Sequence, residues 1–404
     1  MGHDTMITRP DAVERMLSLH RGLVDGPTDA VSLSEITGRM LADEIVATAD
    51  SPPNSHATMD GFAFDATDEY PLELAGEVYP EDDPPEIAAG QAVAIATGAP
   101  LPARANAVLK REEATVNDGQ LSGTSIAPGT YVYERGSNIT AGESLFSPGE
   151  RLGPQDAILL RDLGYETVTV RSRLSVGLLA TGTEIHEGRS ADLDTPMLSG
   201  LVQAWGHHPT EAGTVPDAYE QVRDRIAELA AEHDVVITTG GTSVGHKDYV
   251  VRALADLGSV HFHGVRIRPG KPIAVATLED HNATAIAIPG KPVGAYTIAV
   301  AVVRPFFTGR EEIGTVEAVL QRDIGIPREG FEYWIPVDLS RGANGTQAMP
   351  LGHIDSPLGV YDDTFDPSVL SSSTRASRAA GMLITEEAVA AGDVVQVAPH
   401  DSFV

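Results

Sequence analysis

Three short apolar runs, each followed by a glycine-containing loop and a helix-like stretch, constrain the fold of this chain more than any other feature. The runs cover residues 176–179, 235–238 and 285–288. Predominantly apolar runs of this length are typical of parallel strands buried on both faces. Helical patterns lie between and after them, at 197–207, 219–232, 249–257 and 293–307. The alternation predicts a doubly wound α/β domain over residues 174–309.

The rest of the chain is patterned differently. From residue 52 to 133, prolines and glycines separate short β-type runs, which predicts a small β domain. After Gly309 the helical pattern stops, and β-type runs predict a terminal β-barrel or sandwich. Three short helices are also expected, over residues 10–22, over 35–41 behind a Ser34 N-cap, and over 154–163.

The charge balance limits the partners that this chain can have. Its 404 residues include 58 acidic and 28 basic side chains, for a net charge of −30. Such a charge argues against nucleic acid or an anionic membrane as a partner. Dispersed acids with only four lysines indicate a surface adapted to high salt (halophilic), although a merely acidic protein is the alternative. The absence of cysteine excludes disulfides and thiolate sites. Without a signal or membrane-spanning run, we expect a cytoplasmic protein.

Three loops follow the three strands and are the first candidates for a binding site. They are Ala180-Thr-Gly-Thr-Glu184, Thr239-Gly-Gly-Thr-Ser-Val-Gly245 and Pro289-Gly-Lys-Pro292. In open α/β sheets, ligands bind beyond the carboxyl ends of the strands, and free N–H groups at helix starts favour phosphate or another oxyanion. The second loop is too short for a Walker A motif. A simple tight turn is the alternative.

Lysines favour the oxyanion interpretation. Three of the four lysines, Lys247, Lys271 and Lys291, lie in or beside these loops. Arg266 and Arg268 precede Lys271, and we expect them to share one face of a strand. Basic residues scattered on an exposed edge are the alternative.

Carboxylates also occur at these loops, at Glu184, Asp217 and Asp248, and Asp60 lies in Thr58-Met-Asp-Gly-Phe62. Near a bound phosphate such groups hold Mg²⁺ or orient it through water. Each is alternatively a helix cap or a surface charge, and Asp217 in particular precedes the helix expected at Tyr219.

Together these segments resemble the MoeA family, the molybdopterin molybdenumtransferases, which include the gephyrin E domain. The resemblance covers nearly the whole chain in order and spacing. Besides the three loops, it is carried by Ser51-Pro-Pro-Asn, Ala57-Thr-Met-Asp-Gly-Phe-Ala63, Ala96-Thr-Gly-Ala-Pro100 and Arg268-Pro-Gly-Lys-Pro272.

The resemblance implies a multi-domain α/β fold in an L-shaped homodimer. Its expected parts are a discontinuous, elongated linker domain (1–50 and 140–173), an inserted β domain (51–139), a MogA/MoaB-like α/β domain (174–309) and a C-terminal β-barrel (310–404). It also implies that adenylylated molybdopterin and molybdate, or tungstate, give molybdenum cofactor and AMP with Mg²⁺. A MogA/MoaB-type adenylyltransferase is the implied source of the substrate.

Site residues carry over from the resemblance position by position. The implied catalytic residues are Asp60, Glu184, Asp217, Asp248 and Lys271, with Asp217 and Asp248 as metal ligands. Asp60 and Thr97 are expected to reach the partner's cleft. The implied substrate-binding residues are Thr97, Thr181, Gly182, Gly240, Gly241, Thr242, Ser243, Arg268, Pro289, Gly290, Lys291 and Ser368.

The chain departs from the family pattern at several positions. Lys291 and Gly294 stand where asparagine and serine are usual, Ser137-Asn138 replaces an acidic pair, and no arginine occurs within residues 333–337. A diverged pterin-binding or scaffolding relative that inserts no metal is therefore the alternative. A MogA-like adenylyltransferase is a third hypothesis, which the additional domains argue against.

Overall fold

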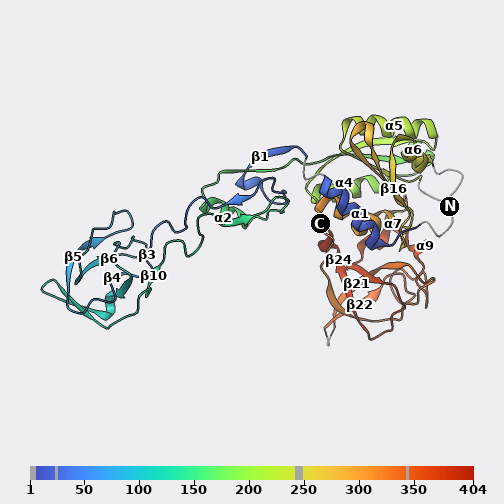
Figure 1. The fold of residues 1–404 in the computed structure, drawn as a ribbon. Helices are drawn as coiled ribbons and strands as arrows, with labels where there is room; N and C mark the ends of the chain where they lie inside the picture. The colour runs from blue at the N-terminus through green and yellow to red at the C-terminus, as the bar shows by residue number, and fades with distance from the viewer. Residues whose placement is uncertain (1–5, 23–25, 242–248, 343–344) are drawn as a thin grey trace. The chain divides into compact units, whose positions relative to one another are not determined.

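The computed structural model describes residues 6–22, 26–241, 249–342 and 345–404. The chain forms two compact units. The larger unit contains Met1–Pro27 and Ser172–Val404, and the smaller contains Thr28–Arg171 (Figure 1). In the part of the chain that the structure describes, no helix is long and apolar enough to cross a membrane.

A six-stranded sheet lies at the centre of the larger unit. Its first four strands run parallel and its last two are antiparallel to their neighbours. The order is β14 (His208–Val215), β13 (Ser175–Thr181), β15 (Val235–Thr239), β19 (Ala283–Ile288), β18 (Ala274–Leu278) and β16 (Ser259–His263). The three predicted buried strands are confirmed as the adjacent central strands β13, β15 and β19.

Helices cover both faces of this sheet, as predicted for a doubly wound domain. Because successive side chains of a strand point to opposite faces, Ile237 of β15 packs with one set of helices and Val236 with the other. One core includes residues of α4 (Asp194–Ala204), α7 (Pro292–Ile298), a π-helical turn (Ala299–Val303) and α8 (Arg304–Thr308). The other includes residues of α5 (Tyr219–Glu232) and α6 (Tyr249–Leu257).

A closed barrel follows the α/β domain and confirms the barrel prediction. The ring runs β21 (Glu332–Gly342), β22 (Gly345–Pro350), β20 (Val316–Leu320), β24 (Val394–Pro399) and β23 (Gly381–Thr385), which pairs again with β21. The short strand β17 (Ile267–Arg268) precedes the barrel in the sequence but pairs with β21, with Arg268 opposite Tyr333. This pairing fixes Arg268 at the junction of barrel and α/β domain.

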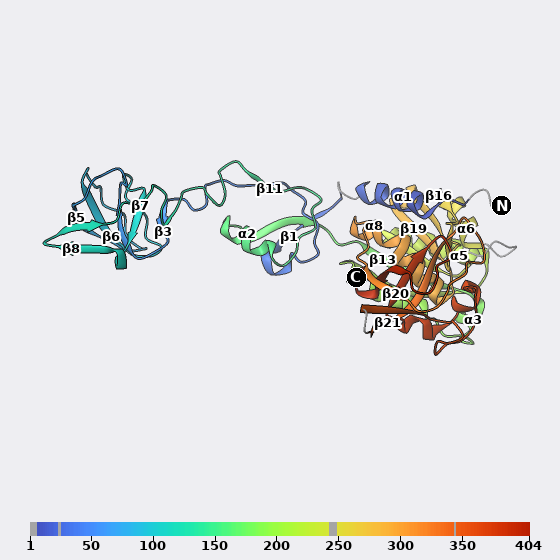
Figure 2. The ribbon, with the colours of Figure 1, turned by 90° about the horizontal axis from the view of Figure 1, so that it is seen from below.

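Helix α1 (Arg9–Gly22) packs in the larger unit rather than with the linker domain to which residues 1–50 were assigned (Figure 2). Its buried side chain Met16 joins the same core as Phe306 of α8. At its start, Arg9 Nε lies 2.7 Å from a carboxylate oxygen of Glu332 in the barrel. The apolar side of α1 is thus buried against α8. This burial explains why α1 belongs to the larger unit, whereas residues 28–171 form the smaller unit.

The smaller unit confirms an inserted β structure. Its six-stranded sheet has the order β7 (Ala107–Lys110), β4 (Gly61–Phe64), β6 (Gln91–Ile95), β5 (Leu72–Val78), β9 (Gln120–Gly123) and β8 (Ala114–Asn117). Segments that precede this sheet in the sequence pair with segments that follow it, in three short antiparallel ladders. The pairs are β1 (Thr28–Ser32) with β12 (Thr167–Arg171), β2 (Ile45–Val46) with β11 (Ser144–Phe146), and β3 (His56–Ala57) with β10 (Val132–Tyr133). Helix α2 (Asp156–Asp162) is the helix predicted over 154–163.

The helix predicted behind Ser34 is wrong. The structure has a single 3₁₀ turn, Leu33–Glu35, whose N-cap is Ser32. The Ser32 N–H donates to the Glu35 carboxylate, and Leu41 already forms an isolated bridge with Val170. The cap therefore lies two residues earlier than predicted, and strand pairing begins before a helix can extend.

Candidate functional site

The carboxyl ends of β13, β15 and β19 are joined by hydrogen bonds between their loops. The Thr181 hydroxyl donates to the Thr239 carbonyl over 2.9 Å, and the Gly240 N–H donates to the Ile288 carbonyl over 3.1 Å. Gly240 has a φ of +83°, and a Cβ there would lie 2.6 Å from the Thr181 carbonyl oxygen. Only glycine therefore fits where the three strand ends meet.

A cavity of about 320 Å³ lies beside these loops. Its wall combines the ends of β15 and β19, the loop after β17, the first turn of α7, and α9 (Pro367–Leu370) with the residue after it. The lining residues are Gly240, Gly241, Arg268, Pro269, Gly270, Lys271, Pro272, Pro289, Gly290, Lys291, Gly294, Pro367, Ser368 and Ser371. We call this space the cation cavity, because the described residues that line it include three basic side chains and no carboxylate.

Arg268 enters the cation cavity from β17. Its guanidinium carbon lies 4.7 Å from the centre of the Phe331 ring, so the charged plane is held against an aromatic face. Its Nε is buried and has no hydrogen-bond partner among the residues that the structure describes. A buried donor without an acceptor is costly, which points to a ligand that supplies acceptor oxygens.

Lys271 directly follows a tightly packed glycine, Gly270. Gly270 has a φ of +113°, and a Cβ there would lie 2.6 Å from a side-chain carbon of Ile298. The Lys271 carbonyl accepts from the Val265 N–H over 3.0 Å, which closes the loop. The backbone that carries Lys271 is thus held by close packing on one side and by a hydrogen bond on the other.

Lys291 approaches the same cavity from the start of α7. Its Nζ donates to the Ser368 carbonyl over 3.4 Å. Asp366, the N-cap of α9, accepts from the Ser368 N–H and hydroxyl. Chiefly the hydroxyl bond, and to a smaller extent the charge of Lys291, lowers the pKa of Asp366. The cap thereby orients the α9 turn against Lys291.

The structure brings most of the predicted substrate-binding residues together but separates Arg266 from them. Arg266 is exposed and does not line the cavity, so the prediction that it shares a face with Arg268 is wrong. The Arg266 N–H donates to the Ile7 carbonyl, and the Arg266 carbonyl accepts from the Glu332 N–H. The side chain of Arg266 is exposed to solvent. Sequence reasoning missed Phe331, for which no motif exists, and Asp366, whose Asp-Pro-Ser cap pattern was visible beside Ser368.

The acidic residues Glu184 and Asp217 lie at the same carboxyl edge of the sheet, which we call its acidic side. Here Asp217 forms its hydrogen bonds within the protein. An Asp217 carboxylate oxygen accepts from the Thr183 N–H over 3.3 Å, and the Thr183 hydroxyl accepts from the Asp217 N–H over 3.1 Å. Asp217 therefore holds the start of α3 (Thr183–His186), next to Gly182, and does not cap α5, whose N-cap is Ala218. Glu184 lies in α3 and is exposed, with its carboxylate over Gly182.

Four residues that the sequence suggested for this edge of the sheet are not described by the structure. Thr242, Ser243, Lys247 and Asp248 lie outside the described residues. Within the ranges that are described, no group of three acidic or histidine side chains is arranged to hold a metal ion.

Asp60 and Thr97 meet in the smaller unit. One Asp60 carboxylate oxygen accepts from both the N–H and the hydroxyl of Thr97, each over 2.7 Å. These two bonds, the backbone one first, lower the pKa of Asp60. The two residues that the resemblance named in the inserted domain thus form one hydrogen-bonded pair.

Comparisons with known proteins show the family to which this chain belongs. Residues 7–164 match the MoeA N-terminal region (domain I and II), and residues 177–309 match the probable molybdopterin binding domain. The chain is 32% identical to the molybdopterin molybdenumtransferase of Synechococcus elongatus over 299 residues, which cover 69% of this chain and 74% of that protein. It is 30% identical to the Haemophilus influenzae molybdopterin molybdenumtransferase over 291 residues, or 69% and 72% of the two chains.

Solved structures agree in fold. A crystal structure of a molybdopterin biosynthesis MoeA protein from Pyrococcus horikoshii matches with a TM-score of 0.76 and 26% identity, covering 98% of this chain and 99% of the other. A second one from the same organism matches with a TM-score of 0.75 and 23% identity, covering 98% and 100%. With both sequence relatives and fold in agreement, the chain belongs to the MoeA family of molybdopterin molybdenumtransferases.

Proposed function

We propose that this protein inserts molybdate into adenylylated molybdopterin and releases AMP, within molybdenum cofactor biosynthesis. The observation that carries the proposal is the convergence of Arg268, Lys271 and Lys291 on one cavity beside the glycine loop of β15. The names of the sequence relatives support the same transferase reaction.

The cation cavity suits a small dianion such as molybdate or tungstate. Arg268 offers a planar set of donors whose orientation Phe331 restrains, and the two lysines act as point charges. Charge-assisted hydrogen bonds from such groups are the strong ones. Held beside the glycine loop, the oxyanion would lie next to a pterin phosphate bound at Gly240 and Gly241. The proposed phosphate contacts include Thr242 and Ser243.

For the acids, we propose that Asp217 and Asp248 hold Mg²⁺ while Glu184 and Asp60 act at the phosphoanhydride. The described residues supply no complete set of metal ligands, so no step is assigned to the ion. Asp217 is already committed to Thr183 through its carboxylate, which makes it a positioning residue for the loop after β13 in addition to any ligand role.

The assembly and setting are proposals as well. We propose a homodimer in which Asp60 and Thr97 of one protomer reach the partner's cleft, and a MogA/MoaB-type adenylyltransferase that supplies the substrate. A cytoplasm rich in salt fits the net charge of −30, because the Debye length of about 3 Å at about 1 M salt screens repulsion between surface acids.

A second candidate function is binding of the pterin without insertion of metal. The observation that favours it is the cavity wall itself: Gly294 lines the cavity without a hydroxyl, and Lys291 replaces the amide usual in the family. A Cβ at Gly294 would make only ordinary van der Waals contacts, with Gly270 at 3.5 Å and Pro289 at 3.8 Å, so steric crowding does not explain the missing side chain.

One assay separates the two functions. The purified protein is incubated at high salt with adenylylated molybdopterin and Mg²⁺, with and without molybdate, and AMP is measured. Release of AMP that requires molybdate supports insertion. Tight binding of the pterin without any AMP release would leave only the binding function. Omission of Mg²⁺ in the presence of EDTA tests the metal requirement in the same assay, and size-exclusion chromatography with light scattering tests the dimer.

A further inference from the structure

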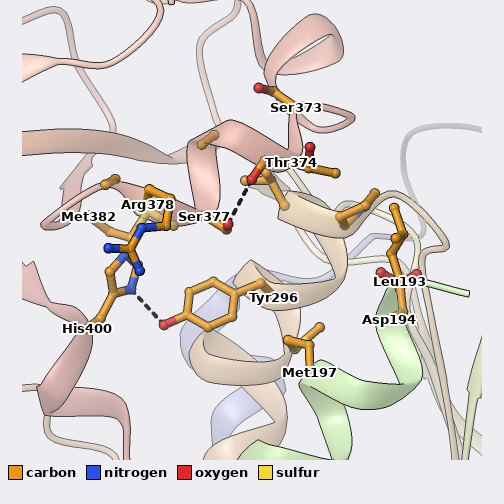
Figure 3. A pocket seen from close by; sticks show the side chains of 14 residues that line it. Leu193, Asp194, Met197, Tyr296, Ser373, Thr374, Ser377, Arg378, Met382 and His400 are labelled. Atoms are coloured by element: carbon orange, nitrogen blue, oxygen red, sulfur yellow. Dashed lines mark hydrogen bonds between the residues drawn. The ribbon is translucent and has the colours of Figure 1, made fainter.

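The proposed substrate carries an anionic phosphoanhydride, so a further contact to it requires positive charge that the protein does not itself neutralise. A second cavity, of about 650 Å³ on the other side of the first turn of α7, does not supply such charge (Figure 3). Its lining includes one cation, the exposed Arg378, and one acid, the buried Asp194. These opposite charges offset each other, so this cavity does not favour an anion.

The smaller unit contains a cation that is not offset in this way. Residues 51–139, all of which the structure describes, include 14 acidic and four basic side chains. Three of the four basic side chains are held by a neighbour: Arg104 by Asp68 at 2.8 Å, Arg135 by Asp50 at 2.7 Å, and Lys110 by the Tyr131 ring, whose centre is 4.4 Å from Nζ. The fourth, Arg111, is exposed, and its guanidinium forms no hydrogen bond or ion pair with any described residue.

Strand register places Arg111 beside Asp60 and Thr97. Strands β6 and β7 both run antiparallel to β4, and the last residue of each pairs with its first residue, Gly61. Asp60 therefore comes just before this end of the sheet in the sequence, and Thr97 and Arg111 come just after it. The Arg111 N–H donates to the Asp60 carbonyl over 3.2 Å. A Cβ on Gly61 would overlap the Leu109 carbonyl oxygen, so only glycine lets β7 come this close.

The charge of Arg111 acts on this end of the sheet but is not used up by it. The two Thr97 hydrogen bonds, the backbone one first, and to a smaller extent the Arg111 charge lower the pKa of Asp60. Asp60 thus has its partners in Thr97, and no ion pair forms between Asp60 and Arg111. A guanidinium presents its donors in a planar fork that matches two oxygens of a phosphate group. Arg111 therefore remains available for an anionic ligand.

We propose that Arg111 is a further substrate-binding residue, which enters the partner's cleft together with Asp60 and Thr97 and binds the phosphoanhydride of adenylylated molybdopterin. The inference rests on the proposed function and on its homodimer. The two groups of cations then act on different substrates, because the cation cavity holds the oxyanion and Arg111 holds the phosphates.

Kinetics with each substrate varied in turn test this division. Arg111→Ala is expected to raise KM for adenylylated molybdopterin ~10-fold, while KM for molybdate changes less than ~2-fold. Lys110→Met is the matched control, because it removes the neighbouring charge that Tyr131 already holds, and it should leave both KM values unchanged. An equal rise of KM in both variants would mean that any nearby charge suffices, and would overturn the specific role of Arg111.

Mixed dimers test whether Arg111 serves the partner's cleft. Protomers with Arg111→Ala are co-expressed with protomers that carry Arg268→Ala, and AMP release is measured with the pterin substrate well below its KM. If Arg111 acts across the dimer, each mixed dimer has one site with both arginines and one with neither. About half of the dimers are mixed, so about a quarter of the wild-type activity is expected. Activity no higher than the mean of the two separate variants would overturn the proposal.

Failure of the proposed function gives a different result from failure of this inference. If the wild-type protein binds adenylylated molybdopterin but releases no AMP, the transferase proposal fails, and the Kd of that ligand, measured by calorimetry, decides on Arg111. A Kd raised ~10-fold in Arg111→Ala but not in Lys110→Met supports the contact, and an unchanged Kd overturns it. A protein that light scattering shows to be monomeric overturns both the homodimer and the role of Arg111 across it.

Discussion

The two sides of the carboxyl edge of the central sheet differ in how far their charges are satisfied within the protein. On the basic side, Arg268, Lys271 and Lys291 line one cavity, and Arg268 Nε has no hydrogen-bond partner in the described part of the chain. On the acidic side, Asp217 exchanges two hydrogen bonds with Thr183. Unsatisfied groups indicate a place prepared for a ligand, whereas satisfied ones hold the backbone. The basic side should therefore control oxyanion binding, and the Asp217–Thr183 hydrogen bonds on the acidic side should contribute chiefly to local stability.

The largest effect is expected from Arg268. Arg268→Ala removes two or more charge-assisted hydrogen bonds to the oxyanion, each worth ~1.5–3 kcal/mol. We expect kcat/KM for molybdate to fall ~10²-fold or more, measured by molybdate-dependent AMP release. Arg266→Ala is the matched control, since that exposed arginine is two residues away and outside the cavity. Equal losses in both variants would contradict the assignment of the cation cavity.

A smaller effect on the same side is expected from Lys291. Its Nζ is 3.4 Å from the Ser368 carbonyl, so part of its charge is already shared with the α9 turn. Lys291→Ala should raise KM for molybdate ~10-fold, with a smaller change in kcat. Lys291→Arg should retain most of the affinity. Lys291→Asn introduces the side chain that is usual in the family. If this variant instead improves AMP release, Lys291 serves a binding function without metal insertion.

Much of this comparison could be predicted from the sequence, for reasons that differ by residue. Apolar runs predicted β13, β15 and β19, because a strand buried on both faces must be apolar throughout. The scarcity of lysine predicted that Lys271 and Lys291 cluster. Phe331 could not be predicted as the partner of Arg268, because that contact depends on β17 pairing with a barrel strand more than sixty residues later.

Local capping was also hard to predict. Asp217 precedes α5 in the sequence and was a candidate cap for it, but it bonds instead to Thr183, 34 residues earlier, across adjacent strand ends. Likewise, Ser32 rather than Ser34 caps the turn at Leu33–Glu35. Which of several short polar side chains accepts an N–H depends on tertiary geometry that spacing alone does not specify.

On the acidic side, the comparison predicts a loss of stability without a loss of oxyanion affinity. Thr183→Val removes the hydroxyl that accepts from the Asp217 N–H, at an expected cost of about 1 kcal/mol in the free energy of unfolding, measured by urea denaturation. KM for molybdate should change less than ~2-fold. Thr183→Ser keeps the hydroxyl and serves as the control. A large rise in KM with unchanged stability would reverse the proposed division between the two sides.

The smallest effect is expected at Asp60 in the smaller unit, where an acid is satisfied as it is at Asp217. Hydrogen bonds from Thr97 hold the pKa of Asp60 below its ordinary value. A carboxyl whose folded pKa is depressed adds stability above its unfolded pKa of about 3.9, and that stability is lost as the pH falls through the folded pKa.

Thr97→Val removes the hydroxyl bond to Asp60 but keeps the backbone N–H bond, which is the larger cause of the lowered pKa. The pKa of Asp60, followed by carboxyl-carbon NMR, should therefore rise only part of the way to its ordinary value. Stability of the variant relative to wild type should fall only at neutral and mildly acidic pH, with the difference vanishing below both pKa values; a pKa of Asp60 unchanged by the substitution would mean that the backbone N–H alone sets it.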